Sequence, residues 1–197
     1  DALVSALGLN AAGLSASTIC RLKEQWLKEH ETWSRRKLSL ENYVYWWADE
    51  VHFRIRSEVA NSCILVIIGV TEAGNKEFVA IEEGLRESEL SWLEVLNSLK
   101  SRGLKSGPLL ATGDGALGFW KALSKTFGDT IQQRCWVHKT ANVLNKLPKS
   151  SQQAAKEKLH DIWMAETRSA AYRAFDLFLE TYSREVPKGR QMPRERP

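Results

Sequence analysis

Two aspartates in this chain of 197 residues have positions at which a carboxylate could do chemistry. Asp49 follows the apolar run YVYWWA, and Asp114 follows the short apolar run LLATG and precedes a glycine. Read alone, Asp114 fits a turn residue or a helix N-cap as well as it fits a ligand. Asp49 is expected to be buried within a strand, where an unpaired charge costs on the order of several kcal/mol. Asp49 therefore needs a partner or a metal ion.

A cysteine and a histidine form a second candidate, in the stretch QRCWVH at 133–138. Cys135 and His138 have a C-x-x-H spacing, which also occurs in zinc sites. A structural zinc site usually needs four ligands, and no second pair stands at a suitable distance along the chain. The spacing therefore disfavours zinc.

The stretch GLSASTICRLKEQW at 13–26 is typical of the turn and second helix of a helix-turn-helix. Small polar residues start the helix, with Ser15 or Ser17 as N-cap, and basic side chains extend from it. Such side chains can meet phosphates and base edges. An ordinary capped surface helix explains the same pattern. The candidate DNA-binding residues are Ser15, Ser17, Thr18, Arg21 and Lys23.

Hydrophobic periodicity predicts the elements that must position these residues. The first predicted strand starts at Tyr43, and four more cover 61–70, 78–85, 107–114 and 130–137. The strand at 61–70 is expected to be buried on both faces. The first three strands are close enough in sequence to form an antiparallel meander. One predicted helix ends near Trp33, and two more cover 88–104 and 115–128. From 139 to about Tyr182 the pattern is again helical, with a boundary at Pro148.

This order, β-β-β-α-β-α-β followed by helices, is that of a ribonuclease H-like α/β fold with a mixed sheet. In that architecture the first strand is central and the fourth lies beside it in parallel, so that Asp49 and Asp114 face each other across a short gap. Two such carboxylates repel unless a cation lies between them, and Mg²⁺ prefers oxygen ligands. Two ions about 4 Å apart suit phosphodiester chemistry. Glu50 points to the opposite face of its strand and is the weaker ligand candidate.

Five segments, in order and spacing, resemble the Mutator-type transposases of bacterial insertion sequences over about residues 13–188. They are GLSASTICRLKEQW, YWWADEVHFRIR, VIIGVTEAGNKEFVAIEEGLRESELSWLEVLNSLKSRGL, LLATGDGALGFWKAL and QRCWVHKTANVLNKLP. The resemblance implies a DDE-type enzyme of DNA transposition and recombination. It also implies a helix-turn-helix segment at 1–40, a catalytic core at 41–146, the start of an all-helical insertion at 147–187, and an irregular tail at 188–197.

The same resemblance implies roles for individual residues. Asp49 and Asp114 become the first two catalytic aspartates, which share two Mg²⁺ or Mn²⁺ ions. Cys135 and His138 match the C-x-x-H signature of the family, and we expect them to order the site and not to bind zinc. Metal-activated water would cut double-stranded DNA at the element ends, and the freed 3′ hydroxyl would attack target DNA. Self-association is left open.

The third catalytic carboxylate of the family, a glutamate, belongs beyond the insertion, and no glutamate of this chain matches its position. Glu180 and Glu185 fall in the segment that resembles the insertion and are not assigned this role. The family pattern fails after about Lys188, and a reading frame shifted by one nucleotide permits KADRCLAKDR, which resembles the family's continuation. We therefore expect a frameshifted, truncated and catalytically deficient copy.

Other functions compatible with the residues are a nuclease of the same fold, and a non-catalytic DNA-binding regulator or relic of a transposase. A net charge of +4 and a pI near 9.0 lean toward anionic partners. Three cysteines far apart disfavour a disulfide framework and favour a reducing compartment. No apolar run approaches the roughly 20 residues that span a bilayer. We expect a nucleoid-associated protein of the bacterial cytoplasm with no membrane partner.

Overall fold

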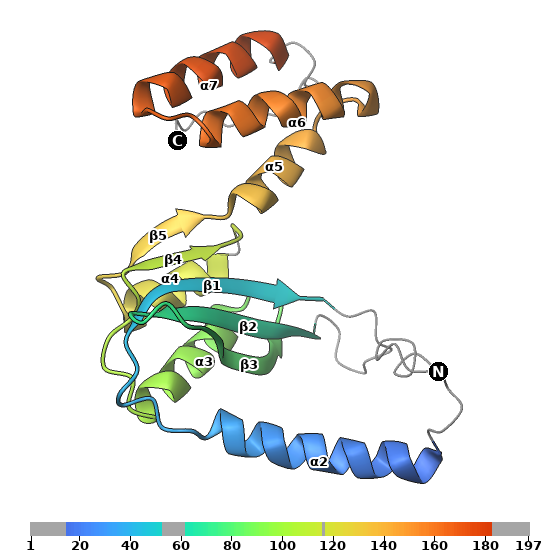
Figure 1. The fold of residues 1–197 in the computed structure, drawn as a ribbon, viewed down its shortest axis with the longest axis vertical. Helices are drawn as coiled ribbons and strands as arrows, with labels where there is room; N and C mark the ends of the chain where they lie inside the picture. The colour runs from blue at the N-terminus through green and yellow to red at the C-terminus, as the bar shows by residue number, and fades with distance from the viewer. Residues whose placement is uncertain (1–14, 53–61, 116, 183–197) are drawn as a thin grey trace. The chain divides into compact units, whose positions relative to one another are not determined.

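The computed structural model of the protein describes residues 15–52, 62–115 and 117–182 (Figure 1). Within these residues, five strands form a mixed sheet in the order β3-β2-β1-β4-β5. The predicted mixed α/β class is therefore confirmed. The elements in chain order are α2 (Ala16–Ser34), β1 (Tyr43–Val51), β2 (Ser62–Thr71), β3 (Lys76–Leu85), α3 (Glu89–Ser101), β4 (Leu110–Gly113), α4 (Leu117–Thr126), β5 (Ile131–Arg134), α5 (Trp136–Leu144), α6 (Lys149–Trp163) and α7 (Arg168–Tyr182).

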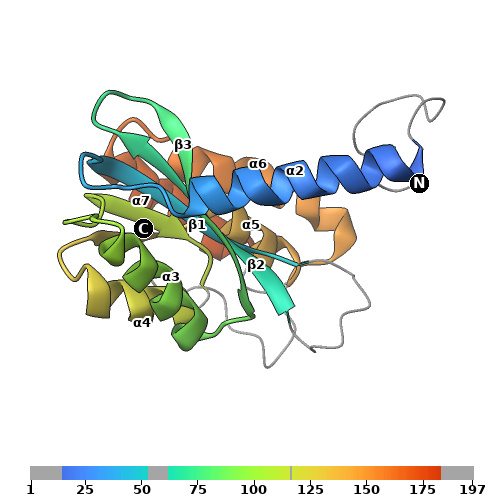
Figure 2. The same ribbon diagram turned by 90° about the horizontal axis from the view of Figure 1, so that it is seen from below.

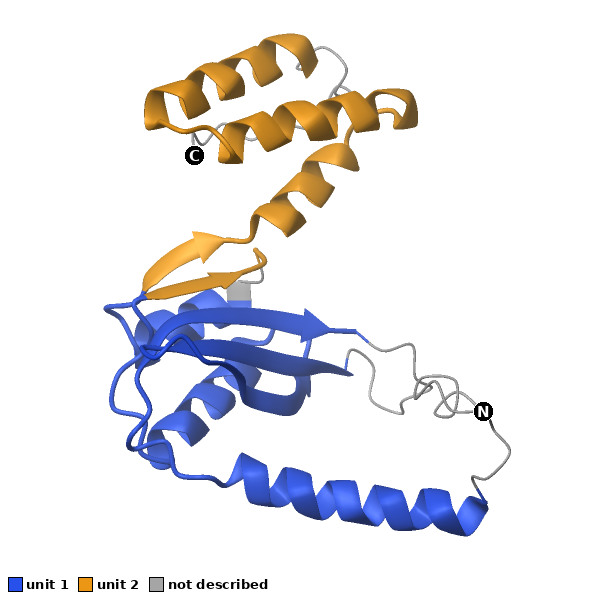
Figure 3. Ribbon diagram, in the orientation of Figure 1, with its two compact units in different colours: residues 1–109, 117–130 blue, residues 110–116, 131–197 orange. Residues whose placement is uncertain are grey.

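The chain divides into two compact units, which are described in turn (Figure 3). The first comprises residues 1–109 and 117–130, and the second comprises residues 110–116 and 131–197. The four segments expected from the family resemblance stay predictions. The part of the expected helix-turn-helix that precedes residue 15, and the tail at 188–197, lie outside the described residues.

The first unit contains the antiparallel meander that the sequence predicts. In β1 and β2, Asp49 lies opposite Val66, and in β2 and β3, Ile67 lies opposite Ala80. Only alternate residues of β2 are fully buried. The prediction that this strand is buried on both faces is therefore wrong, because an antiparallel sheet packs its core against one face and leaves the other partly open. The buried side chains of the meander include Trp46, Ala48, Cys63, Leu65, Ile67 and Val79.

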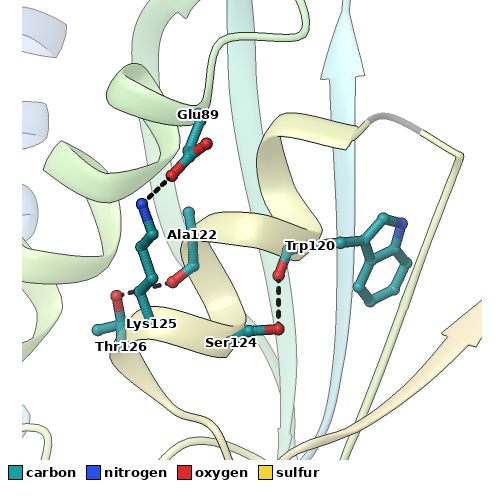
Figure 4. Close-up of polar contacts among 6 residues, drawn as sticks. All are labelled: Glu89, Trp120, Ala122, Ser124, Lys125 and Thr126. Carbon is teal, nitrogen blue, oxygen red and sulfur yellow. Dashed lines mark hydrogen bonds and ion pairs between the residues drawn. The ribbon is translucent and has the colours of Figure 1, made fainter.

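Helices α3 and α4 lie side by side against the meander (Figures 1 and 2). Trp92 of α3 packs edge-on against Phe119 of α4, with 4.8 Å between ring centroids. Figure 4 shows the ion pair that also joins the two helices, in which Lys125 Nζ lies 2.5 Å from Glu89 Oε1. The hydrogen bond from Lys125 holds the pKa of the Glu89 carboxyl below its usual value. Exposed ion pairs stabilise little, so the aromatic contact is the stronger link.

Helix α2 begins at its predicted cap, where the Ser15 hydroxyl accepts the backbone N–H of Thr18 at 3.2 Å. None of its side chains is fully buried. Just beyond the helix, Arg36 Nη2 donates to the Phe78 carbonyl at 2.6 Å. Phe78 belongs to β3, a strand at the edge of the sheet. The bond satisfies an edge carbonyl and attaches the C-terminal end of α2 to the meander.

The second unit joins a short parallel strand pair to three helices. β4 and β5 pair in parallel from Leu110 opposite Ile131 to Gly113 opposite Arg134. β5 stops at Arg134, three residues before the predicted end, because Cys135 caps α5. Among the described residues, no helix combines the length and the apolarity needed to cross a membrane. The core of the three helices consists of Val143, Leu147, Ala155, Leu159, Ile162, Phe175, Phe178 and Tyr182.

Candidate active site

Asp49 lies on the open face of β1, in the first unit. The strand buries Trp46 and Ala48 on one face and exposes Tyr45, Trp47 and Asp49 on the other. The expectation that Asp49 is buried is therefore wrong, because the aromatic residues around it are themselves exposed at 44% and 42%. Burial thus gives no reason for a metal at this residue. The open face does leave the carboxylate accessible to solvent and to a cation.

The backbone immediately after Asp49 orients its carboxylate. The Glu50 backbone N–H donates to Asp49 Oδ1 at 2.9 Å. A carboxylate held by its neighbour's N–H keeps lone pairs for other partners, since two oxygens offer about four acceptor sites. Asp49 is thus positioned and retains capacity to bind a cation.

Glu50 has a different role, which the sequence did not indicate. Its Oε1 accepts the indole N–H of Trp92 at 2.9 Å, and its Oε2 accepts the backbone N–H of Glu87 at 2.9 Å. Trp92 is only 1% exposed, so this carboxylate supplies a hydrogen-bond acceptor that a buried indole needs. Glu50 therefore secures the start of α3, which agrees with its predicted status as the weaker ligand candidate.

Asp114 directly follows β4, in the second unit, and its side chain is half-buried. The backbone N–H of Gly115 donates to Asp114 Oδ1 at 2.6 Å. This is the turn chemistry that the Asp-Gly pair predicts. As at Asp49, the N–H of the next residue fixes the orientation of a carboxylate that could also bind a metal.

Arg134, a residue that the sequence did not single out, lies against this turn. A Cβ added to Gly115 would overlap Arg134 Nη2 and lie 3.0 Å from Cζ. The guanidinium therefore covers the backbone of the residue that follows Asp114. The pairing of Gly113 with Arg134 at the ends of two parallel strands explains this position. The only signal in the sequence is the position of Arg134 directly before Cys135.

Cys135 and His138 lie at the start of α5, in the same unit. The Cys135 backbone N–H donates to the Gly113 carbonyl at 2.7 Å, which ties the first residue before α5 to the end of β4. His138 Nδ1 is buried and has no hydrogen-bond partner among the described residues. Both side chains are half-buried. Their ordering role is compatible with this backbone tie and stays a prediction.

The candidate DNA-binding residues surround the N-terminus of α2. Ser15 Oγ, which caps the helix, also lies 2.8 Å from Ser17 Oγ and 3.0 Å from Thr18 Oγ1. Arg21 and Lys23 are exposed one turn further on. The structure thus describes one helix of the expected motif, and DNA binding by it stays a prediction.

The two aspartates offer the donor type that a hard divalent cation prefers, carboxylate oxygen. Across residues 15–52, 62–115 and 117–182, no group of three or more His, Cys, Asp or Glu side chains could hold a metal ion. The carboxylate donors of Asp49 and Asp114 are of the type that magnesium prefers, and a metal site built from these two residues stays a prediction.

A family model described as "Transposase, Mutator family" matches residues 1–195. The chain therefore belongs to the Mutator family of transposases, and the resemblance read from the sequence is confirmed. The transposase for insertion sequence element IST2 of Acidithiobacillus ferrooxidans is 48% identical over 188 residues, which are 95% of this chain and 64% of that protein. The transposase for IS6120 of Mycolicibacterium smegmatis is 46% identical over 179 residues, covering 91% and 55%. The chain thus spans 55 to 64% of the length of these relatives.

Among solved structures, the chain is similar to the catalytic core domain of HTLV-2 integrase in complex with magnesium. That match has 15% sequence identity and a TM-score of 0.31, and covers 69% of this chain and 85% of the integrase chain. A TM-score of this size is too low to assign the fold.

Proposed function

We propose that this chain carries the DNA-binding and two-aspartate part of an insertion-sequence transposase with a ribonuclease H-like core. The observation that carries the proposal is the family match over residues 1–195, which includes both aspartate segments. Asp49 and Asp114 are the proposed catalytic residues and the proposed ligands of Mg²⁺ or Mn²⁺. A bound divalent ion would supply the Lewis acidity that phosphodiester cleavage needs.

The residues of the chain would contribute orientation and access. The backbone N–H groups of Glu50 and Gly115 hold the Asp49 and Asp114 carboxylates in fixed directions. Asp49 is exposed, so a DNA strand can reach it without local unfolding. Double-stranded DNA of the element ends is the proposed partner, and the bacterial nucleoid is the proposed location.

We further propose that the 197-residue chain alone binds this DNA and cuts it weakly or not at all. Two carboxylates are a smaller ligand set than two-ion phosphoryl transfer normally uses, and the described residues contain no group of three or more His, Cys, Asp or Glu side chains that could hold a metal ion. Helix α2, with exposed Arg21 and Lys23, would make the first contacts with DNA phosphates.

The proposal is tested with the purified chain and labelled duplexes taken from the DNA that flanks its gene on both sides. We expect salt-dependent binding, and Mn²⁺ binding measured by calorimetry that Asp49→Asn and Asp114→Asn each weaken at least tenfold. Cleavage is followed on denaturing gels in Mg²⁺ and in Mn²⁺. Strong cleavage that survives both substitutions would refute the site assignment, and no binding to any duplex would refute the function.

A non-catalytic DNA-binding regulator is the second candidate, favoured because the described residues contain no group of three or more His, Cys, Asp or Glu side chains that could hold a metal ion. This candidate predicts sequence-specific binding that is unchanged by Asp49→Asn, by Asp114→Asn and by chelation of metal. Sedimentation of the DNA complex would also show whether the chain self-associates. Cleavage of RNA–DNA hybrids in preference to duplex DNA would instead indicate a nuclease.

A further inference from the structure

Arg134 lies at the same end of its strand pair as Asp114. In the parallel register, Gly113 is opposite Arg134, so the residues that follow β4 and β5 leave the sheet at one edge. The hydrogen bond from the Cys135 N–H to the Gly113 carbonyl, 2.7 Å long, holds the two strand ends together. The backbone therefore fixes where the Arg134 side chain starts relative to Asp114.

The absence of a side chain at Gly115 makes room for the guanidinium. Because a Cβ there would overlap Nη2 and lie 3.0 Å from Cζ, any other residue at this position would displace the Arg134 side chain. Gly115 is also the residue whose N–H orients Asp114. One glycine thus aligns a carboxylate and admits a cation beside it.

The chemistry of the group suits a phosphate. Arg134 is exposed, and a guanidinium presents a planar fork of donors that matches two phosphate oxygens. A DNA phosphate brought to Asp114 would be repelled by the carboxylate, and the positive charge of a guanidinium that lies against the next residue, Gly115, offsets this repulsion.

We propose that Arg134 binds a phosphate of the DNA strand held at Asp114, so that it positions DNA at this carboxylate. The inference rests on the proposed function and adds a substrate-binding residue to it. The contact is to the sugar–phosphate backbone, so it is independent of base sequence.

The test measures binding of the 197-residue chain to flanking duplexes by fluorescence anisotropy, in EDTA, across a range of salt concentrations. Arg134→Gln is compared with Arg173→Gln, a control on α7 whose exposed guanidinium bonds only to Ser169 among the contacts of the described chain. Each variant removes one positive charge from a chain of net charge +4. We expect Arg134→Gln to weaken binding about fivefold and to lower the salt slope by about 0.9. The control should stay within about twofold, because it keeps the Arg134 contact on which the proposal depends.

Two further variants separate the contact from general effects. Arg134→Lys keeps the charge and should restore the salt slope while recovering only part of the affinity, since an ammonium lacks the fork. Gly115→Ala displaces the flexible end of the Arg134 side chain and should weaken binding by no more than Arg134→Gln does, and the double variant should be no weaker than Arg134→Gln alone. Melting curves check that all variants fold.

A DNA-side substitution locates the contact. A set of duplexes is used in which each duplex has one neutral methylphosphonate at a different position. At one position the methylphosphonate should weaken binding of the wild type about fivefold and leave binding of Arg134→Gln unchanged. Arg134→Gln binding with wild-type affinity and salt slope would overturn the inference and leave the proposed function standing. Failure of the unaltered chain to bind any duplex would overturn both.

Discussion

Asp49 and Glu50 are adjacent acidic residues, and substitutions should separate a residue of the site from a residue of the fold. Glu50→Ala leaves the indole N–H of Trp92 without its acceptor, and Trp92 is 1% exposed. An unsatisfied buried donor costs about 1–3 kcal/mol. The bond to the Glu87 N–H, an exposed group, adds little. We therefore expect Glu50→Ala to lower the free energy of unfolding by about 2 kcal/mol.

Asp49→Ala should lower the same free energy by less than about 0.5 kcal/mol, because the side chain is exposed and its one described bond is to the next N–H. Urea unfolding followed by far-ultraviolet circular dichroism measures both changes, and calorimetry measures Mn²⁺ binding. Glu50→Gln, which keeps an acceptor for Trp92, should regain most of the lost stability.

The result that would refute this reasoning is the reverse pattern. If Glu50→Gln abolished Mn²⁺ binding and Asp49→Ala did not, then Glu50 would be the ligand and the face assignment of β1 would be wrong. A double-mutant cycle with Trp92→Phe provides the internal control. Because Phe has no N–H to satisfy, Glu50→Ala should cost about 1–2 kcal/mol less in that background.

Three further predictions concern the first unit. Burial raises the pKa of Tyr43, and the hydrogen bond that its hydroxyl donates to Glu77 raises it further. The free energy of unfolding should therefore fall as the pH rises above about 10, where the tyrosine ionises in the unfolded chain. Tyr43→Phe should remove that slope in urea titrations between about pH 10 and 12, and an unchanged slope would contradict this. Burial raises the pKa of the Cys63 thiol, so iodoacetamide at pH 8 should label exposed Cys20 first, as read by mass spectrometry of peptides; equal rates would count against it. Gly103 has φ +102°, so Gly103→Ala should cost about 1–2 kcal/mol in the same urea assay, and a neutral effect would show that the turn relaxes.

Much of the fold follows from local signals. The cap at Ser15, the boundary at Pro148 and the meander all stem from residue preferences that act over a few positions. The end of β5 did not follow, because Cys135 caps α5 and the apolar residues after it belong to that helix. The apolar pattern by itself does not mark where the strand gives way to the helix.

One argument for the candidate site was incorrect, and the site itself stays a prediction. The run YVYWWA suggested a buried strand, yet Tyr45 and Trp47 are exposed and place Asp49 on the open face. Composition alone does not tell which face of an aromatic strand is covered. The contact between Arg134 and Gly115 was equally invisible, since it depends on the absence of a side chain.

Asp49, Asp114 and Arg134 share one feature, which is that a backbone N–H of the following residue helps to position each of them. The N–H groups of Glu50 and Gly115 orient Asp49 and Asp114, and the N–H of Cys135 anchors the strand end that carries Arg134. Main-chain groups positioned in this way belong to strands or their immediate ends, so they do not depend on rotamers of other side chains. A carboxylate or guanidinium built so can be exposed and still be directed. The solvent exposure of Asp49 and Arg134 is therefore compatible with defined roles in binding metal and DNA.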